Sequence, residues 1–267
     1  MHPIAFQIGS LTIRWYGVMA ALGFITAMFL LEYNRRFAKL SKDQCSTLLF
    51  LAMISGILGA RIFYVVQFFH YYRDNLWNII RIDQGGLVFY GGFLLALAVL
   101  ALYCKLRKLD IIRVLDVFVP AMTAAHGLGR IGCFLNGCCY GKITSAWWGV
   151  TPPAGSQLAM AAGTLPLHPI QLVEAGENFL LCLLYCWMLR RVKRGVVISS
   201  YLIIYAVLRF VNETLRGDNV FYANLTPAQW ICILLTVAGT GLLTMFLRRK
   251  DDGSEAKCKL FLAELYQ

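Results

Sequence analysis

Seven apolar stretches alternate with short polar segments along the chain. Each stretch is close to the roughly 20 residues that a helix needs to cross a hydrocarbon layer. The pattern predicts transmembrane helices near residues 13–33, 45–67, 87–105, 111–129, 169–189, 196–215 and 227–247. We therefore expect an all-α membrane protein with seven transmembrane helices, built as a single integral-membrane domain over residues 1–267.

The longest polar insertion lies between the fourth and fifth predicted spans, at residues 130–168. It is rich in Gly, Pro and Ser and holds two adjacent tryptophans, Trp147 and Trp148. We expect this insertion to form a small head outside the membrane. Residues 248–267 are expected to form a short cytoplasmic tail.

Basic residues gather at alternate ends of the predicted spans, which sets the orientation of the chain. The positive-inside rule places such clusters in the cytoplasm. The amino terminus and the 130–168 head are then outside, and the carboxyl terminus is cytoplasmic. The clusters follow spans one, three, five and seven and comprise Arg35, Arg36, Lys39, Lys42, Lys105, Arg107, Lys108, Arg113, Arg190, Arg191, Lys193, Arg194, Arg248, Arg249, Lys250, Lys257 and Lys259.

Composition supports a lipid environment. Apolar residues make up 59% of the chain and charged residues 15%, and the mean hydropathy is +0.63. A net charge of +11 would suggest nucleic acid if the basic residues formed one patch. Because most of them mark one side of the membrane instead, we expect no nucleic-acid partner. The basic cluster follows the first apolar segment, the reverse of a cleavable secretory signal, so none is expected.

Four arginines lie toward the outer ends of predicted spans, where orientation does not explain them. An arginine at the bilayer centre costs about 2.5–3.5 kcal/mol on insertion scales, so such residues normally face a bundle interior or a wet cavity. They are Arg61, Arg130, Arg209 and Arg216.

Spacing places polar groups on one face of two of these helices. Tyr205, Arg209 and Glu213 are four residues apart, and Gln171 and Glu174 are three apart. One interpretation is a set of ion pairs that holds the helices together. The other is a cationic pocket for an anionic lipid head group, because the planar guanidinium matches phosphate oxygens and stays charged when desolvated.

A glycine- and cysteine-rich run, residues 126–141, closes the fourth predicted span and begins the head. Its five glycines predict tight backbone turns and close approach of a ligand. Five further motifs accompany it in the sequence. The six are Ile13-Arg14-Trp15-Tyr16-Gly17, Gly59-Ala60-Arg61, Gly86-Leu87-Val88-Phe89-Tyr90-Gly91-Gly92, the run from Gly129-Arg130 through Asn136-Gly137 to Gly141, His168-Pro169-Ile170-Gln171 with Glu174-Ala175, and Tyr205 through Arg209 and Glu213 to Arg216-Gly217-Asp218.

In this order, and over nearly the whole chain, the motifs resemble those of the prolipoprotein diacylglyceryl transferases. The resemblance implies transfer of a diacylglyceryl group from phosphatidylglycerol to the lipobox cysteine of a bacterial prolipoprotein signal peptide, with release of glycerol phosphate. It also implies seven spanning helices and an outward-facing head in the bacterial cytoplasmic (inner) membrane, with no metal and no cofactor. We expect a monomer in contact with membrane lipid.

The motif matches and the chemistry together predict the site residues. Arg130 and Arg209 are expected to grip the phosphate of the leaving group, where fixed cations in a low-dielectric site are most effective. Glu213 and Arg216 are expected to organise Arg209. The other predicted substrate-binding residues are Tyr16, Arg61, Asn136, Gly141, Gln171, Glu174 and Tyr205.

The motifs do not identify a single residue as the base that removes the thiol proton. This chain has Tyr90 where many family members have a histidine, and a tyrosine titrates near pH 10, so it is a poor base without help. His126 lies one helical turn before Arg130. We hypothesise that His126 takes part of the proton-handling role; a hydrogen bond within the fourth span is the alternative. Both Tyr90 and His126 are catalytic candidates.

Cys133 and Cys138 stand where many family members have asparagine and glutamate. With Cys139 they are expected on the oxidising side, where a disulfide can form. A zinc site is not excluded by their spacing, and simple packing is the third alternative.

Two other functions stay open. A small anion or lipid transporter would also bury arginines, although the halves of the chain show no inverted repeat. A family member with a different acceptor would fit the departures at Tyr90, Cys133 and Cys138.

Overall fold

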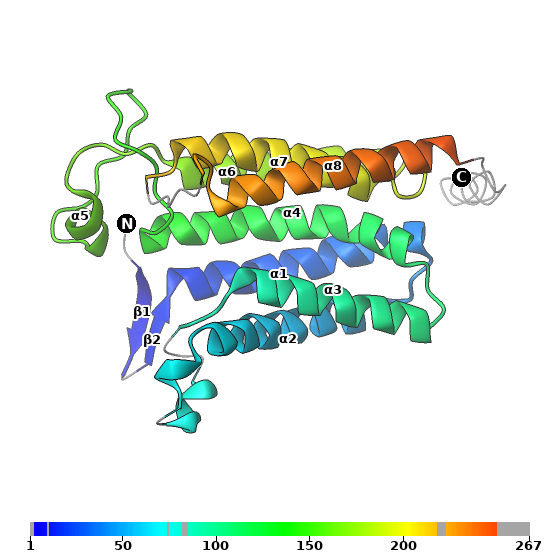
Figure 1. The fold of residues 1–267 in the computed structure, drawn as a ribbon, viewed down its shortest axis with the longest axis horizontal. Helices are drawn as coiled ribbons and strands as arrows, with labels where there is room; N and C mark the ends of the chain where they lie inside the picture. Colours follow the sequence, from blue (N-terminus) through cyan, green and yellow to red (C-terminus); the bar gives the residue numbers. More distant parts are fainter. Residues whose placement is uncertain (1–2, 10, 74, 82–84, 218–222, 250–267) are drawn as a thin grey trace. The chain divides into compact units, whose positions relative to one another are not determined.

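The computed structural model describes residues 3–9, 11–73, 75–81, 85–217 and 223–249, so nearly all of the predicted tail lies outside the described residues. Helices of 18 residues or more overlap all seven predicted stretches (Figure 1). They are α1 (Trp15–Asn34), α2 (Lys42–Gln67), α3 (Phe89–Leu106), α4 (Ile111–Asn136), α6 (Ile170–Met188), α7 (Val196–Leu215) and α8 (Pro227–Arg248).

Length and composition qualify five of these helices as membrane spans. In the described part of the chain these are α1, α2, α4, α7 and α8. Helix α3 contains a shorter apolar segment, Tyr90–Leu106, and α6 carries Glu174 and Glu177 in its first half. The predicted helical, multi-pass membrane class is confirmed, and the count of seven spans stays a prediction.

Two local features differ from the sequence prediction. An antiparallel hairpin of β1 (Ile4–Ile8) and β2 (Leu11–Arg14) precedes α1. Helix α4 also continues to Asn136 instead of ending near residue 129. Two of its glycines serve packing there: a Cβ on Gly127 would lie 2.8 Å from the Phe179 ring, and one on Gly132 would lie 3.3 Å from the Tyr16 ring.

Residues 38–114 form one of two compact units. In this unit α2 packs along α3, where a Cβ on Gly59 would lie 2.5 Å from the carbonyl oxygen of Gly91. Glycine at both positions lets the two backbones approach closely, as small residues do in membrane helix pairs. The segment between the helices contains the 3₁₀ turns η2 (Phe69–Tyr71) and η3 (Leu76–Ile79).

The other unit holds residues up to 37, including most of the 3₁₀ turn η1 (Arg35–Ala38), and residues from 115 onward. Its core includes a buried cluster from α4, α6 and α7: Val119, Leu181, Tyr185 and Val197. Between α4 and α6 the chain forms the short helix α5 (Gln157–Ala162) and isolated bridges that pair Leu167 with Ile143 and Val150.

A buried carboxylate of α4 fixes the start of α7. Asp116 is 5% exposed and accepts hydrogen bonds from the backbone N–H groups of Gly195, at 2.6 Å, and Ile198, at 2.9 Å. These amides would otherwise lack partners, as the first N–H groups of a helix do. A negative charge also favours a helix N-terminus. Asp116 therefore sets the position of α7 relative to α4.

We expect Asp116→Ala to lower the free energy of unfolding by about 2 kcal/mol, because two charge-assisted hydrogen bonds at a buried helix start are lost. Unfolding in mixed detergent micelles measures this. Asp110→Ala is the matched control: Asp110 accepts from the amides of Ile112 and Arg113, but its side chain is 31% exposed. A control loss as large as that of Asp116→Ala would contradict the assignment.

Candidate functional site

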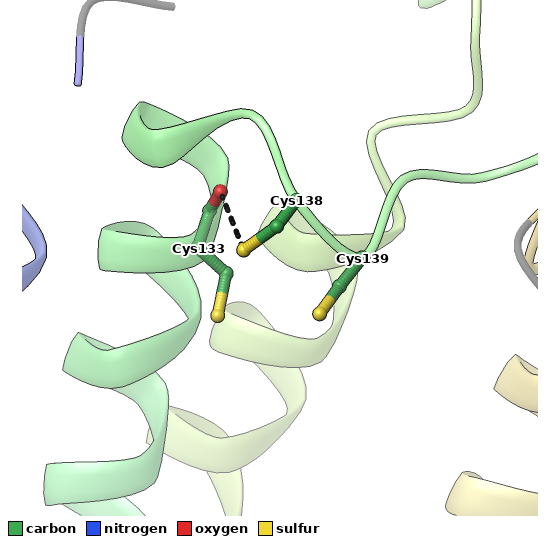
Figure 2. Close-up of side chains that lie close together, drawn as sticks. All are labelled: Cys133, Cys138 and Cys139. Atoms are coloured by element: carbon green, nitrogen blue, oxygen red, sulfur yellow. Dashed lines mark hydrogen bonds between the residues drawn. The ribbon is translucent and has the colours of Figure 1, made fainter. Parts of the chain in front are cut away.

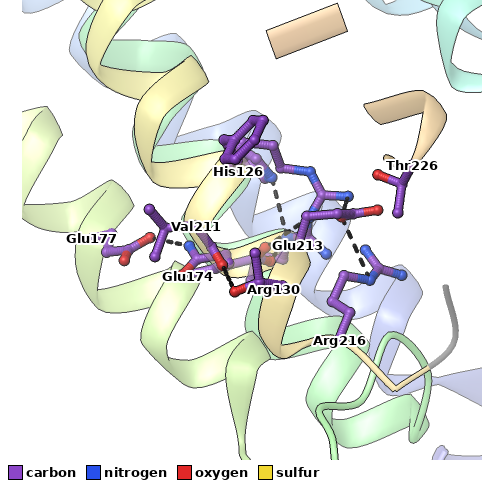
Figure 3. Close-up of polar contacts among 12 residues, drawn as sticks. His126, Arg130, Glu174, Glu177, Val211, Glu213, Arg216 and Thr226 are labelled. Carbon is purple, nitrogen blue, oxygen red and sulfur yellow. Dashed lines mark hydrogen bonds and ion pairs between the residues drawn. The ribbon is translucent and has the colours of Figure 1, made fainter. Parts of the chain in front are cut away.

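A chain of ion pairs joins three helices of the unit that holds the residues up to 37 and from 115 onward. Arg130 of α4 places Nε 2.6 Å from Oε2 of Glu174 on α6. The other oxygen of Glu174 lies 3.0 Å from Nη1 of Arg209 on α7. One carboxylate thus bridges two arginines that are distant in sequence. Figure 3 labels Arg130 and Glu174 among the residues of this set.

The ion-pair chain continues along α7. Arg209 Nη2 lies 2.6 Å from Oε2 of Glu213, one helical turn further on. The same oxygen lies 4.0 Å from Nε of Arg216, just past the end of the helix. The pairing of Glu213 with Arg209 that the spacing predicted is therefore present. Three guanidinium groups face two carboxylates in this chain of contacts.

All five ionised side chains are largely buried. The exposed fraction of these side chains is 4% for Glu174, 7% for Glu213 and 12–15% for the three arginines. Charges in such surroundings require compensation, because removing one partner of a buried pair costs about 3–5 kcal/mol. The ion pairs therefore hold α4, α6 and α7 in register while keeping the arginines charged.

Arg130 retains hydrogen-bonding capacity in this arrangement. It uses Nε for Glu174 and also donates from Nε to Nε2 of His126, at 3.2 Å. Its two terminal nitrogens make no hydrogen bond to the residues that the structure describes. Such a pair of parallel donors matches two oxygens of a phosphate.

His126 acts as an acceptor at Nε2, which assigns the neutral imidazole with its proton on Nδ1. Its ring lies 5.9 Å from that of Tyr205, centroid to centroid. The hydrogen bond within the fourth span, one of the two alternatives drawn from the sequence, is therefore present, and the proton-handling role of His126 stays a prediction.

A cavity of about 260 Å³, counting its mouth, lies among these side chains. Its free interior is about the size of one water molecule. Polar residues dominate its walls, and it is lined by His126, Arg130, Glu174, Glu177, Asn178, Leu181, Tyr205, Leu208, Arg209 and Asn212.

The loop after α4 is fastened to this site. Gln171 donates to the backbone carbonyl of Cys138, at 2.8 Å, and Gly141 forms a backbone bridge with Arg216. A Cβ on Gly141 would lie 2.5 Å from the carbonyl oxygen of His168, so only glycine fits there. Gln171 and Gly141 thus place the loop beside the end of α7. Asn136 is the last residue of α4.

Tyr16 lies in the first turn of α1 and is about half exposed. Its ring lies beside Gly132, half a turn along α4 from Arg130. This contact places Tyr16 beside the end of α4, and its role as a hydrogen-bonding partner stays a prediction.

Arg61 and Tyr90 belong to the unit of residues 38–114. Arg61 is 6% exposed and donates to the carbonyl oxygens of five residues in the segment after η2: Asn78, Ile79, Arg81, Gly85 and Gly86. It therefore holds that segment in place. Tyr90 lies in the first turn of α3 and is 44% exposed.

Two residues that shape this region, Asn212 and Asp116, were not predicted from the sequence. Asn212 donates to Oε2 of Glu177, at 2.6 Å, and lines the cavity. Its position three residues after Arg209, on the same helical face, was the available signal. Asp116, which anchors α7, was a lone acid in an apolar stretch, which is itself a mark of a buried contact.

The residues suited to holding a metal ion, among those that the structure describes, are Cys133, Cys138 and Cys139 at the end of α4. These residues offer thiol sulfur atoms, whereas the ion-pair chain consists of arginine and glutamate side chains.

Comparison with known proteins identifies relatives along nearly the full chain. A family model described as prolipoprotein diacylglyceryl transferase matches residues 3–245. A phosphatidylglycerol–prolipoprotein diacylglyceryl transferase of Clostridium botulinum (strain Langeland) is 35% identical over 236 residues, 88% of this chain and 92% of the relative. The protein of that name from Clostridium tetani is 35% identical over 94% of this chain and 100% of its own length. Phosphatidylglycerol–prolipoprotein diacylglyceryl transferase 1 of Clostridium perfringens is 32% identical over 93% of this chain and 96% of its own length.

We expect Glu174→Gln to lower the free energy of unfolding by about 3 kcal/mol, because Arg130 and Arg209 would both lose a buried counter-charge. Glu177→Gln is the matched control on the same helix. Glu177 accepts one hydrogen bond from Asn212, so its loss should cost about 1 kcal/mol. Unfolding in mixed micelles compares them, and equal losses would refute the bridging role of Glu174.

Proposed function

The chain belongs to the prolipoprotein diacylglyceryl transferase family, and we propose that it transfers the diacylglyceryl group of phosphatidylglycerol to the cysteine thiol of a bacterial prolipoprotein. The observation that carries the proposal is the convergence of Arg130 and Arg209 on Glu174 beside a polar cavity. Buried guanidinium groups at this position suit a lipid phosphate.

The reaction is a displacement at carbon. The thiolate sulfur forms a bond to the glycerol carbon that carries the phosphate, the carbon–oxygen bond breaks, and its electron pair leaves with glycerol phosphate. Negative charge grows on the departing phosphate, so preorganised cations lower the barrier most. Arg130 offers two terminal nitrogens to this phosphate, and Arg209 is held on both sides by Glu174 and Glu213.

Phosphate binding requires the site to open. The free interior holds about one water molecule, which is too small for a phosphodiester. The terminal nitrogens of Arg130 make no hydrogen bond to the residues that the structure describes, so they can donate to a phosphate once the site opens. We infer that the lipid phosphate replaces Glu174 as the partner of Arg130.

This exchange would also release the candidate base. Nε2 of His126 accepts from Nε of Arg130. When Arg130 turns toward the phosphate, Nε2 becomes available to accept the thiol proton. Base activity would then depend on phosphate binding, which suits a reaction that needs thiolate only when the lipid is present.

The remaining predicted residues take supporting roles in the proposal. Tyr205 packs on the His126 ring, and Gln171 and Gly141 fix the loop next to Arg216. Tyr16 and Asn136 are proposed hydrogen-bonding partners of the substrates. Arg61 is proposed to act by positioning residues 78–81, 85 and 86, because its donors are already committed to carbonyl oxygens there.

The site would face the outer leaflet of the bacterial inner membrane. On α4 and α7, Arg130 and Arg209 lie toward the ends remote from the basic clusters around residues 105–113 and 190–194. Under the positive-inside rule those clusters are cytoplasmic. We propose seven spans with α3 and α6 among them, an external amino terminus and head, and a cytoplasmic carboxyl terminus.

A lipobox peptide incubated with the purified protein and phosphatidylglycerol in detergent should gain one diacylglyceryl group on its cysteine, detected by mass spectrometry. Arg130→Lys should slow this by about 10²- to 10³-fold, because lysine keeps the charge but loses the paired donors. Arg249→Lys, after the end of α8, is the control and should retain activity. No adduct with the unaltered protein would instead favour another acceptor or a transporter.

His126→Ala should lower kcat by about 10²-fold, since a positioned proton acceptor is lost. It should also remove a limb of the pH–rate profile. Tyr90→Phe, which deletes only a hydroxyl, should retain most of the activity. The reverse result, with the histidine dispensable and the tyrosine hydroxyl required, would assign the base to Tyr90.

A further inference from the structure

Three thiol groups converge at the end of α4, outside the ion-pair chain. The sulfur atoms of Cys133, Cys138 and Cys139 all lie within 4.8 Å of one another, and each residue is partly buried. Figure 2 shows Cys133 on the last turns of α4 and the other two on the loop that follows it. The three are not paired as disulfides in the structure.

The backbone brings these thiols together by reversing direction after the helix. The N–H groups of Gly137 and Cys138 both donate to the carbonyl oxygen of Cys133, at 3.0 and 3.1 Å. Gly137 has φ +77°, and Cys139 has φ +60°, a left-handed conformation that is unfavourable for a residue with a Cβ. A residue keeps such a strained backbone conformation only where the surrounding structure stabilises it.

The donor set is uniform in chemistry. Three sulfur atoms with no carboxylate or imidazole in the cluster form a soft ligand set, which selects zinc or copper(I) over magnesium, calcium or manganese. Zinc–sulfur bonds are about 2.3 Å long, so sulfur ligands on a zinc ion lie roughly 3.8 Å apart. Sulfurs that lie within 4.8 Å of one another are at most about 1 Å beyond that spacing.

The surrounding charge suits a thiolate cluster. The guanidinium groups of Arg216 and Arg130 interact electrostatically with Cys139. A zinc ion with three thiolates carries one negative charge, which these two arginines would offset.

We propose that Cys133, Cys138 and Cys139 form a three-thiolate zinc site that fastens the loop after α4 to the end of that helix. Zinc with three protein ligands keeps a fourth position for solvent or another ligand. The family resemblance implies no metal, whereas the spacing of these cysteines left a zinc site open, and the proposal takes up that alternative. It lies on the loop that Gln171 and Gly141 fix next to Arg216, so bound zinc would stabilise that loop.

The test is zinc uptake by the full chain, purified in detergent with reduced thiols and stripped of metal. Titration with zinc chloride against a chromophoric chelator, followed by elemental analysis, should give about one tightly bound zinc ion per chain. Cys133→Ala, Cys138→Ala and Cys139→Ala should each abolish that uptake. Cys104→Ala, which removes a buried thiol of α3 instead, should leave it unchanged.

A second measurement needs no variant and is independent of folding defects. Alkylation of the native protein, mapped by mass spectrometry, should show zinc protecting these three cysteines and no others. Uptake that survives the single substitutions, or protection spread over all cysteines, would overturn the proposal. So would a Cys133–Cys138 or Cys138–Cys139 disulfide in protein purified without reductant and unable to take up zinc.

Discussion

Charge buried in a low-dielectric interior must be compensated locally, and the architecture of the site follows from that constraint. Glu174 stands between Arg130 and Arg209, so that one carboxylate neutralises groups from two other helices. Glu213 repeats the arrangement between Arg209 and Arg216. The contacts that make the arginines tolerable in the bundle are therefore the same contacts that aim them at one cavity, and structural and functional readings of these residues converge.

This dual role explains why the carboxylates matter to a protein that binds an anion. Arginines without partners would be costly to bury, and arginines saturated by carboxylates could not bind phosphate. The observed compromise leaves the terminal nitrogens of Arg130 without a hydrogen bond to any described residue, while Nε is shared between Glu174 and His126. Proton handling and phosphate binding are thereby linked through a single guanidinium group.

Periodicity in the sequence predicted the long helices and the shared face of Arg209 and Glu213, because both depend on local spacing. It could not show that Glu174 bridges two helices, since that contact is set by tertiary packing. The glycines of α4 were misleading: Gly127 and Gly132 signal close packing against Phe179 and Tyr16, which from sequence alone looks like a turn. The hairpin before α1 was not predicted because its strands are short. The hydrogen bonds from Arg61 to backbone carbonyl oxygens depend on a loop conformation that residue spacing does not encode.

The small size of the resting cavity has a consequence for chemical fidelity. A pocket that polarises the phosphate ester of a phospholipid could equally let water attack it, which would turn the enzyme into a phospholipase that degrades its own bilayer. With interior space for about one water molecule, the closed arrangement has room for neither a lipid phosphate nor bulk solvent, so an ester can be polarised only after the site has opened around the lipid. Compactness in the empty state thus protects the membrane that supplies the donor.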